Sequence, residues 1–532
     1  MMQMLLLFSL VVVACVLCNQ LTNRIGVPML LAFIGVGMLC GVDGLLGISF
    51  DNYKSTENLC TCALIFIIFY GGFSTKWSEA RPVAGRSVLL STAGVFLTAL
   101  FVGVFCHFVL GFGWLEAMLT GAVLGSTDAA SVFSILRSKQ LSLKYGTASL
   151  LEVESGSNDP IAYMMTTVVL SMMTGNVTAG SIADLLFTQL VFGVGAGVLL
   201  ALITKWFLCR VKLAGNGFDT ILLVAVAILS YVLPTLIQGN GYLSAYICGI
   251  ILGNSNIPNK KKQVGFFDGI TNLMQVTLFF IIGLLSTPSR LPEVILPALG
   301  IALFLTVLAR PIAVALLMTP FRAKLSQQLL ISWSGLRGAT SAVFIVSAIA
   351  GGAVLENDLF HIIFCVILLS IAIQGTLLPA VARKLSMIDE SGNVLKTFTD
   401  YTEEQELQLI QVPISEGSQW AGKQVKELSL PPETLLVMLI RGAETVIPKG
   451  DTVLAEGDTA VLTADAYQDD ERIRLAEIAI TEKHEWCGKE IRSLALKKDK
   501  LLILIRRGEQ TIIPQGHVVI EVGDVVVCNS TD

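Results

Sequence analysis

The sequence predicts an all-α polytopic membrane protein of about 13 transmembrane helices, followed by a small α/β soluble tail. Hydrophobic residues make up 54% of the 532 residues, and the mean hydropathy of +0.73 exceeds that of soluble chains, which need a charged surface. The charge also changes sign along the chain. Residues 1–385 contain 21 Lys and Arg and 15 Asp and Glu. Residues 386–532 contain 15 Lys and Arg and 26 Asp and Glu.

This change of character divides the chain into domains. We assign residues 1–385 to a membrane domain in contact with the lipid bilayer, residues 386–405 to a linker and the rest to the tail. Because an acidic tail has no affinity for phosphate backbones, no nucleic-acid partner is expected.

Thirteen apolar stretches approach the roughly 20 residues that a helix needs to cross a bilayer. The first lacks a charged start and a small-residue cleavage site, so we interpret it as a membrane helix and not as a signal peptide. The stretches are approximately residues 4–22, 25–44, 57–74, 87–109, 114–136, 145–173, 181–204, 219–237, 241–255, 264–286, 292–318, 325–350 and 359–382.

The loops between these stretches predict the orientation. Loops on one side carry 17 Lys and Arg, whereas those on the other carry only Lys54 and Arg290. Because Lys and Arg resist translocation, the side whose loops carry more Lys and Arg is cytoplasmic. The N-terminus is then outside and the tail cytoplasmic. The absence of a eukaryotic targeting signal favours a bacterial inner membrane.

The tail contains a gapless repeat at an offset of 66 residues. Short β-rich runs and glycine turns predict a small α/β unit in each copy, at residues 406–477 and 478–532. Both copies resemble RCK C-terminal (TrkA-C) domains, which are ligand-sensing modules. The resemblance implies a nucleotide or cyclic dinucleotide as candidate regulatory ligand, and no other cofactor is expected. The repeated motifs include Trp420-Ala421-Gly422-Lys423 with Trp486-Cys487-Gly488-Lys489, and Gly457-Asp458 with Gly523-Asp524.

Ionisable side chains in the predicted spans are few and clustered. An ionisable group at membrane depth costs a few kcal/mol or more, so each is a functional hypothesis. On a helix, Ser155 and Asp159 share one face, and Glu154 and Asn158 share the adjacent one. Pro160 frees a backbone carbonyl one turn upstream. A carboxylate, a hydroxyl and free carbonyls form a hard-oxygen site for an alkali cation.

Glycine and serine interrupt the fifth and twelfth spans, around Asp128 and Arg337. We expect both spans to unwind near the middle of the membrane. Unwound backbone at this depth is tolerated only where it lines a cavity, as in transporters built from inverted repeats. The ion site is therefore predicted where these spans meet the sixth.

These motifs, in this order and spacing, resemble the cation/proton antiporter superfamily, specifically its NhaP-like electroneutral branch. The motifs are Ser126-Thr127-Asp128-Ala129-Ala130, Glu154-Ser155-Gly156-Ser157-Asn158-Asp159-Pro160 and Gly335-Leu336-Arg337-Gly338-Ala339. The resemblance implies a homodimer, inverted repeats with crossed broken helices and elevator-type alternating access.

By the same resemblance, Asp159 binds either the cation or the proton. The ion site is completed by Asp128, Thr127, Ser155 and Asn158, the last at the position where electrogenic relatives carry a second aspartate. Glu154 is expected to form a structural ion pair with Arg337.

Two further residues are expected to support the transport domain. Arg310, beside Pro311, is interpreted as structural. Tyr70 precedes Gly71-Gly72 where many relatives place an acidic residue, which weakens the case for sodium.

The predicted function is electroneutral exchange of a monovalent cation, potassium favoured over sodium, for protons, and no enzymatic activity. Competition for one carboxylate would couple the two fluxes. Two alternatives remain. A cation channel gated by the RCK-like tail would need a selectivity filter such as Thr-Val-Gly-Tyr-Gly, which the sequence lacks. A membrane sensor would reuse the same fold.

Overall fold

The structure is a computed structural model, and its contacts divide the chain into two units, Met1–Glu403 and Glu404–Asp532. The first predicted span and most of the linker lie largely outside the described residues. The structure describes residues 9, 12–17, 28–50, 52–139, 141–175, 178–211, 217–389, 408–415, 418, 420–428, 430, 434–442, 444–464, 474–481, 484–494, 502–507, 510–512, 514 and 516–530.

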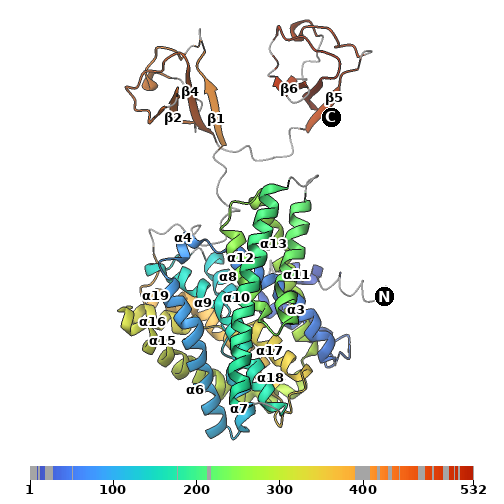
Figure 1. Cartoon of the computed structure of the whole chain (residues 1–532), viewed down its shortest axis with the longest axis vertical. Helices are drawn as coiled ribbons and strands as arrows, with labels where there is room; N and C mark the ends of the chain where they lie inside the picture. The colour runs from blue at the N-terminus through green and yellow to red at the C-terminus, as the bar shows by residue number, and fades with distance from the viewer. Residues whose placement is uncertain are drawn as a thin grey trace. The chain divides into compact units, whose positions relative to one another are not determined.

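The first unit is helical (Figure 1). Three of its helices contain or adjoin a π-helical segment, at Leu90–Gly94, Leu305–Ala309 and Ser370–Gly375. The described helices are α2 (Met29–Cys40), α3 (Tyr53–Ser74), α4 (Trp77–Ala80), α5 (Ala84–Leu89), α6 (Val95–Phe108), α7 (Trp114–Val123), α8 (Ala129–Ser138), α9 (Thr147–Met173), α10 (Ala179–Arg210), α11 (Phe218–Leu236), α12 (Gly241–Gly253), α13 (Lys260–Leu285), α14 (Leu291–Phe304), α15 (Arg310–Met318), α16 (Leu325–Trp333), α17 (Ala339–Ala350), α18 (Leu359–Leu369) and α19 (Thr376–Lys384).

Seven helical stretches among the described residues are long and apolar enough to cross a membrane, and three apolar helices are shorter. These numbers agree with a polytopic membrane protein, while the count of thirteen helices stays a prediction. The long stretches are Tyr53–Ser74, Ala84–Phe108, Gly180–Arg210, Phe218–Leu236, Lys260–Leu285, Pro288–Phe321 and Leu359–Lys384.

Two spans are broken where the sequence predicts it. Residues 124–128 separate α7 from α8, and residues 334–338 separate α16 from α17. The two unwound segments touch, because the backbone N–H of Asp128 donates a 2.8 Å hydrogen bond to the carbonyl oxygen of Leu336. The predicted unwinding is therefore confirmed, and the two breaks face each other.

Helix α9 passes beside this crossing as one continuous helix with Pro160 inside it. It packs against α5, α7, α12 and α17. The Asn240 side-chain amide at the start of α12 donates a 2.9 Å hydrogen bond to the carbonyl oxygen of Pro160. These contacts fix the rotation of α9 and hence the direction of Asp159.

Helices α3 and α12 approach each other closely through glycines. A Cβ atom at Gly72 would lie 2.3 Å from the carbonyl oxygen of Tyr246, and one at Gly253 would lie 2.0 Å from that of Phe73. Only glycine permits this backbone-to-backbone contact, which is a common way for membrane helices to pack.

The second unit contains two four-stranded antiparallel sheets (Figure 1), and the second sheet begins at Arg474, just before the predicted boundary between the two copies at residue 478. The strand orders are β1-β4-β2-β3 and β5-β8-β6-β7. Among the described residues of the tail, the helical segments are the short 3-10 turns Val425–Glu427 and Ile491–Ser493. The strands are β1 (Gln408–Pro413), β2 (Leu435–Arg441), β3 (Glu444–Val446), β4 (Asp458–Ala464), β5 (Arg474–Ala479), β6 (Leu502–Arg507), β7 (Gln510–Ile512) and β8 (Val525–Ser530).

Candidate ion-binding site

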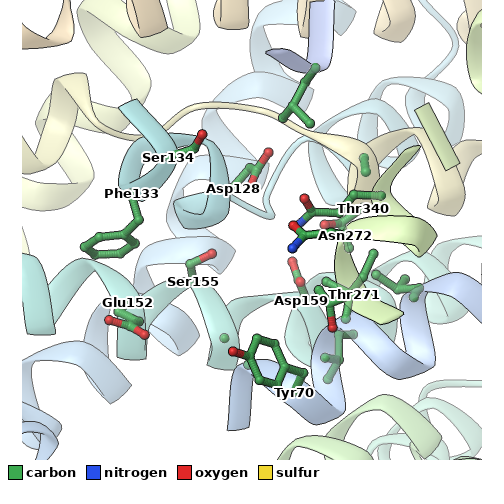
Figure 2. A pocket seen from close by; sticks show the side chains of 18 of the residues that line it. Tyr70, Asp128, Phe133, Ser134, Glu152, Ser155, Asp159, Thr271, Asn272 and Thr340 are labelled. Atoms are coloured by element: carbon green, nitrogen blue, oxygen red, sulfur yellow. The ribbon is translucent and has the colours of Figure 1, made fainter. Parts of the chain in front are cut away.

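A cavity of about 470 Å³ lies beside the crossing of the two broken helices. Four of the five predicted ion-site residues line it, namely Thr127, Asp128, Ser155 and Asp159. Figure 2 shows Asp128, Ser155 and Asp159 around the same space. The structure thus brings together carboxylates and hydroxyls from α9 and from the unwound segment before α8.

Asp159 is nearly buried, with 8% of its surface exposed. The hydroxyl of Ser126, from the unwound segment, donates a short hydrogen bond to Oδ1 of Asp159. Thr340, at the start of α17, also lines the cavity near this carboxylate (Figure 2). The Asp159 carboxylate thus lies in the cavity at the meeting point of three elements.

Asn158 is the one predicted ion-site residue that is not among those lining the cavity. Its side-chain amide donates a 2.5 Å hydrogen bond to the Thr127 hydroxyl, and it is fully buried outside the cavity lining. Ser155 also holds this segment, because its hydroxyl donates a 2.7 Å hydrogen bond to the carbonyl oxygen of Thr127. Asn158 therefore positions Thr127, and a direct part in the ion site stays a prediction.

Asp128 lines the cavity and also holds the start of α8. Its Oδ1 accepts a 3.1 Å hydrogen bond from the backbone N–H of Ser131, and its Oδ2 accepts a short one from the Ser131 hydroxyl. This is the geometry of a helix N-cap, where a negative charge also opposes the helix dipole. Asp128 therefore combines a structural role with a place beside Asp159.

The structure corrects the predicted ion pair between Glu154 and Arg337. Glu154 forms its ion pair with Arg310, and both side chains are at most 3% exposed. Arg337 is fully buried, and its Nη1 donates a 2.5 Å hydrogen bond to the carbonyl oxygen of Ser126. The physical reason is that unwinding before α17 turns Arg337 toward the free carbonyls of the other broken helix, while Arg310 on α15 reaches the carboxylate.

Several cavity residues were missed by the sequence analysis, most importantly Asp268 of α13. The hydroxyl of Tyr70 donates a 3.1 Å hydrogen bond to Oδ1 of Asp268, and both residues line the cavity. Asp268 lies inside a predicted span, so the cost of a charge at membrane depth could have drawn attention to it. The other missed lining residues include Ser74, Ser134, Thr271, Asn272, Gln275 and Thr340.

The donor set is of a kind that suits an alkali cation. Carboxylate, hydroxyl and carbonyl oxygens are hard ligands that suit such ions. Among the described residues, no group of three or more His, Cys, Asp or Glu could hold a metal ion tightly.

Comparison with known proteins agrees with this geometry. The transmembrane sodium/hydrogen exchanger family matches residues 8–384, and the TrkA-C domain matches residues 409–466 and 475–527. The K(+)/H(+) antiporter NhaP of Alkalimonas amylolytica is 34% identical over 82% of this chain and 76% of the relative. The K(+)/H(+) antiporter NhaP2 of Shewanella sp. (strain MR-4) is 33% identical over 84% of this chain and 78% of the relative.

A solved structure has the same fold. The sodium proton antiporter MjNhaP1 from Methanocaldococcus jannaschii at pH 8 aligns with a TM-score of 0.65 and 24% identity, covering 72% of this chain and 99% of the other. With the family match over most of the membrane unit and a matching relative above 30% identity, the chain belongs to the sodium/hydrogen exchanger family and carries two TrkA-C domains at its C-terminal end.

Proposed function

We propose that this chain is a multi-pass membrane antiporter that exchanges one monovalent cation, potassium in preference to sodium, for one proton at Asp159. The observation that carries the proposal is the buried Asp159 carboxylate in a polar cavity at the crossing of two broken helices. A channel is a poorer fit, because the relatives are named as antiporters and the sequence lacks a potassium-filter motif.

Competition at one carboxylate accounts for coupling. When Asp159 is ionised it attracts the cation, with Ser155, Thr127 and Asp128 as further oxygen ligands. When a proton binds, the carboxylate loses its charge and the cation is released. If the ion-carrying helices cross the membrane only with a cation or a proton bound to Asp159, and never with the site empty, one cation is exchanged for one proton. No net charge then moves across the membrane.

The preference for potassium rests on two supports. Relatives that cover most of the chain are named potassium/proton antiporters. The position before Gly71 carries the neutral Tyr70, where the family resemblance places an acidic residue that approaches the ion in some sodium transporters.

The cavity is proposed to open to the cytoplasm. Its lining includes Tyr70 and Ser74 near the end of α3, Glu152 near the start of α9 and Asp268 near the start of α13. In the orientation predicted from the loop charges, these helix ends face the cytoplasm of a bacterial inner membrane. Access from the other side then requires an elevator-like movement of the ion-carrying helices, within a homodimer.

The tail is proposed to regulate exchange by binding a cytoplasmic ligand, with a nucleotide or cyclic dinucleotide as the candidate class. A ligand changes transport only if it binds one conformation better than another. Deleting residues 404–532 should leave exchange intact while altering its dependence on ligand or pH. Complete loss of transport in a well-folded truncated protein would contradict this division of roles.

The first test is proton flux in proteoliposomes on addition of potassium, sodium, lithium or rubidium, with the membrane potential clamped. Wild type should exchange potassium best, at a rate independent of the clamped potential, and Asp159→Asn should not exchange at all. Glu79→Gln, which alters an exposed carboxylate outside the cavity lining, is the matched control. A fully active Asp159→Asn protein would refute the proposal.

A further inference from the structure

Asp268 is a half-buried carboxylate in the cavity wall. It lines the cavity from α13, and none of the ion pairs among the described residues involves it. Water screens its charge only partly, so the charge attracts a cation that enters the cavity.

The carboxylate is held in place by its neighbours. Tyr70 on α3 donates to its Oδ1 at 3.1 Å, and the side-chain amide of Asn272 donates to its Oδ2 at 3.3 Å. One hydrogen bond on each oxygen fixes the orientation of the Asp268 carboxylate in the cavity wall.

Helices α3 and α13, which carry Tyr70 and Asp268, also pack against each other through aromatic side chains. The ring centroids of Phe69 and Phe267 lie 5.4 Å apart, and those of Phe73 and Phe267 lie 6.0 Å apart. These contacts flank Tyr70 and Asp268 in the sequence and belong to one buried cluster around Tyr70. The charge of Asp268 is therefore held at a fixed place in the cavity wall. It lies on α13, whereas Asp159 lies on α9.

We propose that Asp268 is a positioning residue for the transported cation, a fixed negative charge that concentrates cations in the cavity before they reach Asp159. This inference rests on the proposed function and deepens it. Because Asp268 acts by charge, it raises the affinity for potassium, rubidium and sodium by similar factors. Tyr70 contributes by fixing the carboxylate, not by binding the cation.

The test uses the full-length protein and two readouts. One is the KM for each cation in proteoliposome exchange, and the other is the Kd for each cation from thermal stabilisation in detergent. Asp268→Asn should raise both on the order of 3- to 10-fold for all three cations, which is the range expected of one unit charge at intermediate dielectric. Its maximal rate should stay within about twofold of wild type, because Asp159 is untouched.

Three companion variants make the result specific. Asp268→Glu, which keeps the charge, should restore the wild-type KM, and Tyr70→Phe should shift it by no more than about twofold. Glu79→Gln changes an exposed carboxylate outside the cavity lining and should behave as wild type. A merely structural role for Asp268 would lower the maximal rate and the melting temperature without moving KM.

The outcomes separate the two proposals. If wild type exchanges and Asp268→Asn has an unchanged KM and Kd, this inference is wrong while the proposed function stands. If wild type binds cations without exchanging them, the proposed function is wrong, and the Kd of the variants still decides the role of Asp268. If wild type neither binds nor exchanges any of the cations, both are wrong. A change confined to one cation would also overturn the charge-based role.

Discussion

The backbone N–H of Asp128 donates a 2.8 Å hydrogen bond to the carbonyl oxygen of Leu336, joining two segments 208 residues apart in the chain. A second contact runs the other way, from Arg337 Nη1 to the carbonyl oxygen of Ser126 at 2.5 Å. Unwound backbone inside a membrane needs such partners, since lipid offers none. Each broken helix therefore satisfies polar groups that the other leaves free, and the ion site depends on their contact.

This crossing predicts the effect of Gly338→Ala. A Cβ atom at position 338 would lie 2.2 Å from Oδ2 of Asp128, so one segment must move. We expect the purified protein to lose most of its exchange activity, measured by proton flux in proteoliposomes. Gly85→Ala is the control, since a Cβ there meets nothing within 4 Å. Normal activity of Gly338→Ala would mean that the crossing can relax without affecting transport.

The sequence predicted the unwinding correctly because its cause is local. Glycine and serine weaken the helix at residues 125–126 and 334–335, and a nearby charge requires a polar environment. Asp159, Ser155 and Thr127 were assigned to one site by the family resemblance of two motifs, and the structure places all three at the same cavity.

The ion pair was predicted wrongly because its partners come from separate helices. Two buried arginines could reach Glu154, and nothing in their spacing along the chain decides between Arg310 and Arg337. The contact between Tyr70 and Asp268, 198 residues apart, has the same origin. Such pairings depend on how helices pack and rotate, which a hydrophobic pattern does not encode.

The pairing of Glu154 with Arg310 can be tested by a double-mutant cycle. Glu154→Gln or Arg310→Gln alone leaves a buried charge uncompensated, which typically costs about 3–5 kcal/mol. The double variant should therefore lose much less stability than the sum of the single variants, measured by unfolding in detergent. The cycle of Glu154→Gln with Arg337→Gln is the comparison, and it should show the smaller coupling. Equal coupling in both cycles would contradict the assigned partner.

Neighbouring glycines in α3 should respond in opposite ways to the same substitution. A Cβ at Gly72 would lie 2.3 Å from the carbonyl oxygen of Tyr246, so Gly72→Ala should push α3 away from α12 and lower the melting temperature by several degrees. A Cβ at Gly71 meets nothing within 4 Å, so Gly71→Ala should be neutral or stabilise the helix by up to about 1 kcal/mol. Thermal unfolding in detergent compares the two. Similar melting temperatures would contradict the close approach of α3 and α12.

In each copy of the repeat in the tail, an arginine at the end of one strand forms an ion pair with an aspartate at the start of another. Arg441 donates from Nε to Oδ1 of Asp458 at 2.8 Å and from Nη2 to Oδ2 at 2.7 Å. Arg507 holds Asp524 in the same way, at 2.9 Å for both bonds. The hydrogen bonds from these arginines lower the pKa of Asp458 and of Asp524.

The pairs predict local and separate effects. Both pKa values are lower in the folded state than in the unfolded chain. The pairs therefore stabilise the fold at pH values above the unfolded pKa of about 3.9, and this stability is lost as the pH falls through the folded pKa. At neutral pH, Asp458→Asn should lower the free energy of local unfolding of β2 and β4 by about 1 kcal/mol. Hydrogen exchange of peptides from these strands should then be roughly fivefold faster. Peptides from β6 and β8 should be unchanged, and Asp524→Asn should give the reverse pattern. If either variant loosened both sheets equally, the two copies would unfold as one unit, and the pairs would not stabilise their own sheets independently.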